Sequence, residues 1–129
     1  MPRTSANTTP GTWQGEHDKV KHAVSYALKN GYRLIDGAYC YGNEEAVGEG
    51  IKDALDSGIR REDIFVVTKV WATYTSRVEL GLEKSLKNLG LDYVDLFLVV
   101  CVFSAIAPER PADDVAIALA SVVQSRRKR

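Results

Sequence analysis

The sequence predicts an α/β fold in which parallel strands alternate with helices. Segments with apolar residues at helical spacing alternate with short apolar segments of strand length. The segment Ile64–Val67 is continuously apolar, which is typical of a strand buried on both faces of a parallel sheet. Both a doubly wound sheet and a (β/α)8 barrel fit this order of elements. No GxGxxG motif follows any of the expected strands, so the dinucleotide-binding signature of the doubly wound fold is missing.

Three helices are expected from apolar residues at helical spacing and from residues typical of helix ends. Asn43 is expected to cap the second helix, because two acidic residues follow it in the first turn. Ser76 and Glu79 are expected to form a capping box at the start of the third. The glycines expected to close the helices are Gly31, Gly58 and Gly90. The apolar residues at helical spacing in the first helix are Val20, Ala23, Val24, Ala27 and Leu28. The expected buried residues of the other two helices are Val47, Ile51 and Leu55, and Val78, Leu82, Leu86 and Leu89.

Strands are expected at residues 32–35, 64–68 and 94–100, and residues 11–15 are expected to end an earlier strand. Asp36 follows the first of these strands, Tyr41 comes five residues later, and Lys69 follows the second. An ammonium group beside a phenol stabilises the phenolate, and a carboxylate can hold the ammonium in place. The three residues are therefore the material of a proton-transfer site at the carboxyl ends of the strands.

Each of these residues also has a purely structural interpretation. An aspartate after a strand is commonly an Asx turn or a helix cap, a loop tyrosine is commonly partly buried, and a lysine ending a strand usually faces solvent. From the residues alone, both interpretations stay open. His17 and His22 are not spaced for one helix face and have no companion ligands, so no metal site is expected.

The composition is that of one compact domain with no charge preference for its partners. The chain has 129 residues, and its 17 basic residues balance 17 acidic ones. We therefore expect neither nucleic acid nor an anionic membrane as a partner. Two distant cysteines and no secretory signal indicate a reducing compartment, and the cytoplasm is the expected location. The apolar segment 96–107 is shorter than the roughly 20 residues of a spanning helix.

The two ends of the chain differ from the rhythm of strands and helices between them. Residues 1–10 are expected to be irregular, and residues 104–129 form a tail that is expected to be helical from about residue 111. The apolar residues of that helix would be Val115, Leu119, Val122 and Val123. The closing basic run 126–129 is interpreted as a solvated tail, with nuclear import or RNA binding as the alternative.

Several motifs resemble those of the aldo-keto reductases. The run Gly31–Ala38, followed by Glu44 and Val47–Gly48, is similar to the first signature of that family. Three shorter segments resemble its first strand end, its lysine-bearing strand and the approach to its fourth strand: residues 11–14, 67–71 and 89–96. The resemblance covers residues 11–99, and it is greatest to members that reduce small aldehydes and sugars.

The resemblance implies half of a (β/α)8 barrel, spanning residues 11–103, and an oxidoreductase that reduces aldehydes or ketones to alcohols. NADPH would be the cofactor, with NADH as the alternative, and a small carbonyl compound would be the substrate. The implied catalytic residues are Asp36, Tyr41 as general acid, and Lys69. The implied cofactor-binding residues are Gly11, Thr12, Trp13 and Asp36, and Trp13 and Trp71 would line the substrate pocket.

The sequence also departs from the family pattern. Val100, Cys101 and Val102 stand where the family has His-Trp-Pro, so its catalytic histidine is missing. The segment after Val99 is expected to be foreign to the family, through an altered reading frame or exon. A truncated barrel would expose an unpaired strand edge and could self-associate through it. The alternative function is therefore a catalytically inactive fragment or an interaction module.

Overall fold

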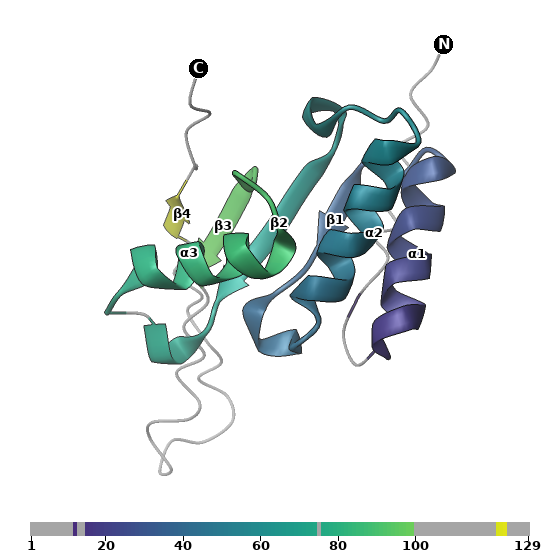
Figure 1. Cartoon of the computed structure of the whole chain (residues 1–129). Coiled ribbons are helices and arrows are strands. Elements are labelled where there is room, and N and C mark those ends of the chain that lie inside the picture. Colours follow the sequence, from purple (N-terminus) through teal and green to yellow (C-terminus); the bar gives the residue numbers. More distant parts are fainter. Residues whose placement is uncertain (1–11, 13–14, 75, 100–120, 124–129) are drawn as a thin grey trace, which may run out of the picture.

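The structure, a computed structural model, describes residues 12, 15–74, 76–99 and 121–123. These residues form one four-stranded sheet in the order β1-β2-β3-β4, with its helices on one face (Figure 1). The strands are β1 (Leu34–Asp36), β2 (Phe65–Val70), β3 (Leu96–Val99) and β4 (Ser121–Val123). The α-helices are α1 (His17–Lys29), α2 (Glu44–Asp56) and α3 (Val78–Leu89), and the short 3-10 helices are η1 (Tyr39–Tyr41), η2 (Arg61–Asp63) and η3 (Ala72–Tyr74).

The first three strands are parallel, as the sequence predicts. Leu34 pairs with Phe65, and Val67 pairs with Leu96, so the carboxyl ends of all three strands point the same way. Each of these strands begins and ends within two residues of its expected bounds. The starts fall later than expected because residues such as Arg33 and Ile64 belong to the connections. The alternation of helix and parallel strand confirms the α/β fold class.

Strand periodicity divides the sheet into two faces with different surroundings. The face covered by the helices presents fully buried side chains, among them Ile35, Val66 and Phe97. The opposite face carries the alternate residues, including Leu34 and Phe65, which are 40% and 45% exposed. The main core therefore lies between the sheet and α1–α3, and it comprises Val20, Val24, Leu28, Ile35, Ala46, Val47, Ile51, Ala54, Ile64, Val66, Val70, Leu89, Val94 and Phe97.

The helix ends confirm the expected glycines and correct one expected cap. Gly31, Gly58 and Gly90 follow the three helices with φ angles of 97°, 104° and 64°. These left-handed conformations cost glycine least, which explains why the helices stop there. The prediction of a capping box at Ser76 is wrong, because the N-cap residue of α3 is Arg77 and its side chain makes no capping hydrogen bond.

Asn43 occupies the expected N-cap position of α2 but does not cap with its side chain. The amide Nδ2 instead donates a hydrogen bond to the backbone oxygen of Thr12, 31 residues earlier. Asn43 is buried, so the side chain serves a contact between distant segments rather than the first turn of its own helix. The acidic residues Glu44 and Glu45 do lie in that first turn, as predicted.

The tail is corrected where the structure describes it. Val122 and Val123 were expected in a helix, but they belong to β4, which pairs antiparallel with β3. The reason is that the outer edge of β3 offers unpaired backbone groups, and an extended segment of valines satisfies them better than a solvent-exposed helix would. The remaining residues of the expected tail helix, and the irregular segment 1–10, lie outside the described residues.

Close packing of α2 against α3 depends on Gly48. A Cβ atom at this position would lie 2.6 Å from the carbonyl carbon of Leu89, which is backbone and cannot rotate away. Only glycine therefore allows the two helices to approach this closely.

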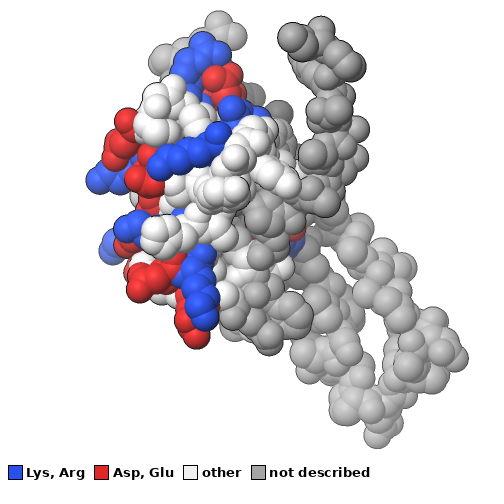
Figure 2. All heavy atoms as spheres, turned by 90° about the vertical axis from the view of Figure 1, so that its right-hand side faces the viewer, with Lys and Arg blue, Asp and Glu red and all other residues white. Residues whose placement is uncertain are grey.

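The surface of the described helices carries charges of both signs. Figure 2 shows basic and acidic side chains interspersed on the side of the molecule that α1 forms. Ion pairs in this region include Lys19 with Glu16 at 2.9 Å and Lys21 with Glu49 at 2.9 Å. Within the described ranges, no helix is both long and apolar enough to cross a membrane.

Candidate active site

Two of the three expected catalytic residues form a direct ion pair. The ammonium Nζ of Lys69 lies 2.6 Å from Oδ1 of Asp36 and also donates to the Gly37 backbone oxygen at 3.0 Å. Asp36 is the last residue of β1, and Lys69 lies on β2 two positions beyond the partner of Asp36. Residues two apart on a strand point to the same face, so Lys69 shares a face with Val67 and with its neighbour Asp36. This is the sheet face opposite the helices.

The surroundings of this ion pair are partly open. The Lys69 side chain is 20% exposed, and the Asp36 side chain is 42% exposed. The backbone oxygen of Gly37 and the carboxylate together hold the ammonium from two sides, so its flexible stem has one preferred position. The pair thus places an ammonium and a carboxylate in direct contact at the carboxyl ends of the strands.

Tyr41 completes the cluster from the connection between β1 and α2. The residue lies in η1, and its ring centroid is 5.4 Å from Nζ of Lys69. At this distance the face of the aromatic ring attracts the cation. The structure therefore brings Asp36, Tyr41 and Lys69 together, although they are spread over 33 positions of the sequence.

A pair of tyrosines connects the loops around this cluster. Tyr39 of η1 and Tyr74 of η3 meet edge to face, with ring centroids 5.6 Å apart. The hydrogen bond between their hydroxyls raises the pKa of Tyr39 and lowers the pKa of Tyr74. The loops that follow β1 and β2 are thus connected directly, which restrains the position of Tyr41 next to Lys69.

The other expected site residues are only partly described. Thr12 is buried, and its Oγ1 atom has no hydrogen-bond partner among the described residues. Trp71 follows β2 directly and is 46% exposed. Gly11 and Trp13 lie outside the described residues, as do Val100, Cys101 and Val102, where the family histidine is expected to be missing.

Sequence reasoning missed a buried polar network behind the cluster. The Glu44 carboxylate accepts hydrogen bonds from Thr68 Oγ1 at 2.6 Å and from Asn88 Nδ2 at 3.1 Å. In the sequence, Glu44 stands out only as an acidic residue of a first helical turn and as part of the family signature. The available signal was Thr68, directly after the apolar run Ile64–Val67, because a buried hydroxyl requires a partner.

A pocket lies beside the loop that carries Tyr41. Its lining consists of Tyr39, Gly42, Glu44, Glu45 and Asn88. Asp36 and Lys69 are not among the lining residues, so this pocket and the ion pair are separate features.

A parallel α/β sheet with an acid, a phenol and an ammonium gathered at its strand ends has the form of part of a (β/α)8-barrel enzyme. The model of the Aldo/keto reductase family matches residues 5–125 of the chain. The chain belongs to this family. The match extends to residue 125, past Val99, where the resemblance was expected to end.

Individual relatives agree with the family. The chain is 71% identical over 89 residues to a D-galacturonate reductase of Hypocrea jecorina. This alignment covers 69% of the chain and 29% of that protein. It is 54% identical over 89 residues to a glycerol 2-dehydrogenase (NADP(+)) of Saccharomyces cerevisiae, covering 69% of the chain and 28% of the relative.

Solved structures give the same result. A Bombyx mori aldo-keto reductase in complex with NADP matches with a TM-score of 0.64 and 45% identity, over 67% of the chain and 29% of that structure. The aldose reductase of Schistosoma japonicum matches with a TM-score of 0.66 and 44% identity, over 70% of the chain and 31% of that structure. The chain thus spans less than a third of the length of these relatives.

Proposed function

We propose that this chain carries part of the catalytic machinery of an NADPH-dependent reductase, which converts the carbonyl group of small aldehydes, ketones or sugars into an alcohol. The observation that supports this most directly is the contact of Lys69 with Asp36 and with the Tyr41 ring, at 2.6 Å and 5.4 Å. Relatives that are named as D-galacturonate reductase and D-xylose reductase suggest sugar-derived substrates.

In the proposed reaction, Tyr41 is the general acid. Its hydroxyl donates a proton to the carbonyl oxygen of the substrate, and the phenolate that remains regains a proton from solvent. The Lys69 ammonium favours this phenolate electrostatically. Asp36 acts through Lys69, since the 2.6 Å ion pair keeps the ammonium close to the Tyr41 ring. NADPH, when bound, supplies the hydride that reaches the carbonyl carbon.

The described residues fit such a cofactor where they can be assessed. The buried Thr12 hydroxyl has no partner within the described ranges, so it could bond a polar group of the cofactor. The Asp36 side chain is 42% exposed and so remains accessible to a ribose hydroxyl. Gly11 and Trp13 are proposed as further contacts to the cofactor, and Trp71, 46% exposed, is proposed with Trp13 as a wall of the substrate pocket.

The test is a titration with NADPH and NADH, followed by turnover assays with D-galacturonate, D-xylose and simple aldehydes. We expect saturable binding of NADPH and turnover that Tyr41→Phe abolishes. Tyr26→Phe is the matched control, because Tyr26 is a tyrosine of α1 that is 72% exposed. No binding of either cofactor by a folded chain would contradict the proposed function.

A second candidate function is that of an inactive interaction module that associates with copies of itself. It is favoured by Leu34 and Phe65, adjacent residues on the sheet face away from the helices that are 40% and 45% exposed. Analytical ultracentrifugation tests this, and a monomer at all concentrations would exclude it. The cytoplasm remains the proposed location. The proposed binding partner is a small carbonyl compound, and not nucleic acid or a membrane.

A further inference from the structure

We propose that Glu44 is a positioning residue, which holds the loop of Tyr41 and the strand of Lys69 in one fixed arrangement. Its importance for a reaction rests on the function proposed above, but the positioning itself does not. The proposal follows from the contacts of one buried carboxylate with two other elements of the fold.

The first step concerns the connectivity around the carboxylate. Glu44 is the first residue of α2 and follows Tyr41 by three positions. Its Oε1 atom accepts a hydrogen bond from Thr68 Oγ1 at 2.6 Å, and Thr68 directly precedes Lys69 on β2. A chain of four residues, one hydrogen bond and one peptide unit therefore connects the proposed acid to the ammonium that assists it.

The second step concerns the direction of the two side chains on β2. Neighbouring residues of a strand point to opposite faces. Thr68 is 1% exposed and points toward the helices, where it meets Glu44, so Lys69 points to the other face. If Thr68 shifts toward or away from the helices, the adjacent backbone that carries the Lys69 side chain therefore moves with it.

The third step concerns the chemistry of Glu44 itself. An ionised carboxylate only accepts hydrogen bonds, and burial without partners would be costly. Glu44 is 3% exposed, and its second oxygen accepts a hydrogen bond from Asn88 of α3 at 3.1 Å. The carboxylate is therefore held from two sides, which makes it a rigid junction between α2, β2 and α3.

The positioning can be measured without cofactor or turnover. The Nζ atom of Lys69 lies 5.4 Å from the centroid of the Tyr41 ring, so the nearby methylene protons of Lys69 are expected to have ring-current shifts in NMR spectra of lysine-labelled protein. Tyr41→Leu removes the ring, so the difference between this variant and the unsubstituted chain gives the size of the shift. We expect Glu44→Ala to lose most of the same shift and Glu44→Gln to keep it, because an amide can still accept from Thr68 and donate to Asn88 Oδ1.

Two controls separate positioning from general loss of stability. Glu45→Ala removes an exposed carboxylate from the same helical turn, and Ile51→Val trims a buried side chain of the same helix. Both variants should keep the Lys69 shift of the unsubstituted chain. A Glu44→Ala protein that folds and retains the full shift would overturn the proposal.

A second pair of variants covers the case in which Glu44→Ala does not fold. Thr68→Ser keeps the hydroxyl and should keep the shift, whereas Thr68→Val removes the hydroxyl at nearly equal volume and should lose it. Equal shifts in these two variants, or a Lys69 spectrum that Tyr41→Leu leaves unchanged, would also overturn the proposal. Failure of the proposed reductase activity affects none of these measurements, so the two proposals can fail independently.

Discussion

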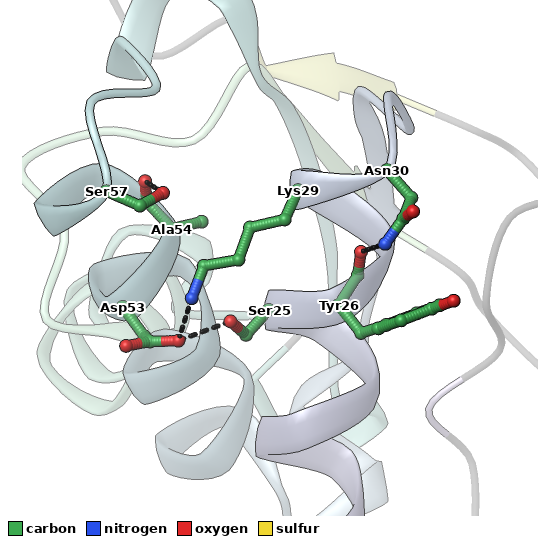
Figure 3. A network of polar contacts seen from close by, with 7 residues as sticks. All are labelled: Ser25, Tyr26, Lys29, Asn30, Asp53, Ala54 and Ser57. Carbon is green, nitrogen blue, oxygen red and sulfur yellow. Dashed lines mark hydrogen bonds and ion pairs between the residues drawn. The ribbon is translucent and has the colours of Figure 1, made fainter.

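The two faces of α2 both carry hydrogen-bonded carboxylates, but in opposite surroundings. Toward β2 and α3, Glu44 is 3% exposed and accepts hydrogen bonds from Thr68 and Asn88. On the face toward α1, the Asp53 side chain is 52% exposed. Its carboxylate accepts hydrogen bonds from Lys29 at 2.7 Å and from Ser25. Figure 3 shows the Asp53 carboxylate of α2 pointing toward Ser25 and Lys29 of α1.

The comparison shows that burial, and not the number of hydrogen bonds, decides what a carboxylate contributes. Water competes for the Lys29 ammonium and screens the charge of Asp53, so loss of this ion pair costs little. Ser25 is buried and would lose its acceptor, but it is a single neutral hydroxyl. Around Glu44 such replacement is restricted, because Thr68 is 1% exposed and its hydroxyl would stay unsatisfied without the carboxylate. We therefore expect substitutions on the inner face of α2 to have much larger effects than those on the outer face.

The largest effect is expected from Gly48→Ala, which tests how tightly the inner face is packed. The new Cβ atom would lie 2.6 Å from the Leu89 carbonyl carbon and would force α2 and α3 apart. We expect the free energy of unfolding in urea to fall by about 3 kcal/mol. Glu49→Ala, a substitution on the outer face of the same helix, is the control; an equal loss in both variants would contradict the comparison.

The next effect is expected from Glu44→Ala, because the Thr68 hydroxyl and the Asn88 amide both lose their acceptor. The free energy of unfolding should fall by about 2 kcal/mol, and by distinctly less in Glu44→Gln. Urea denaturation followed by circular dichroism measures both. Identical values for the two variants would show that the hydrogen bonds do not matter for stability.

A smaller effect is expected from acid, and it should arise on the outer face. Hydrogen bonds from Lys21 and Lys29 lower the pKa values of Glu49 and Asp53 below their ordinary values of 4.5 and 3.8. A lowered pKa in the folded state stabilises the protein above the ordinary value, and this contribution disappears as the pH falls through the lowered one. Urea denaturation at neutral pH and near pH 3 should therefore show a smaller acid-induced loss in a Glu49→Gln, Asp53→Asn double variant than in the unsubstituted chain. Equal losses would mean that other groups control the acid sensitivity.

The smallest effect is expected from Asp53→Ala at neutral pH. Its ion pair with Lys29 is solvent-exposed, and Ser25 is its buried partner, so the fall in the urea midpoint should be small and the ion-pair part of it should shrink in high salt. Asp56→Ala, which removes an exposed carboxylate from the end of the same helix, is the reference. A loss for Asp53→Ala that approaches the loss for Glu44→Ala would refute the distinction between the faces.

Much of the candidate site was accessible from the sequence, and the limits of the prediction have physical causes. Asp36, Tyr41 and Lys69 stand directly after or between elements whose periodicity is clear, so their convergence at the strand ends could be inferred. The partners of Asn43 and Glu44 could not be inferred in this way. Both residues are suited to a helix N-terminus, and only the positions of Thr12 and Thr68 show that they serve distant contacts instead.

By itself, the sequence determined the alternation of strands and helices, the glycine-closed helix ends and the residues at the strand ends, because these depend on local periodicity and backbone preference. Only the tertiary structure decided that Val122 and Val123 form a strand and that a glutamate in a first turn becomes a buried junction. The physical reason is that an unpaired strand edge and a buried hydroxyl each take the partner that folding brings nearest, and local sequence does not specify which residue that is.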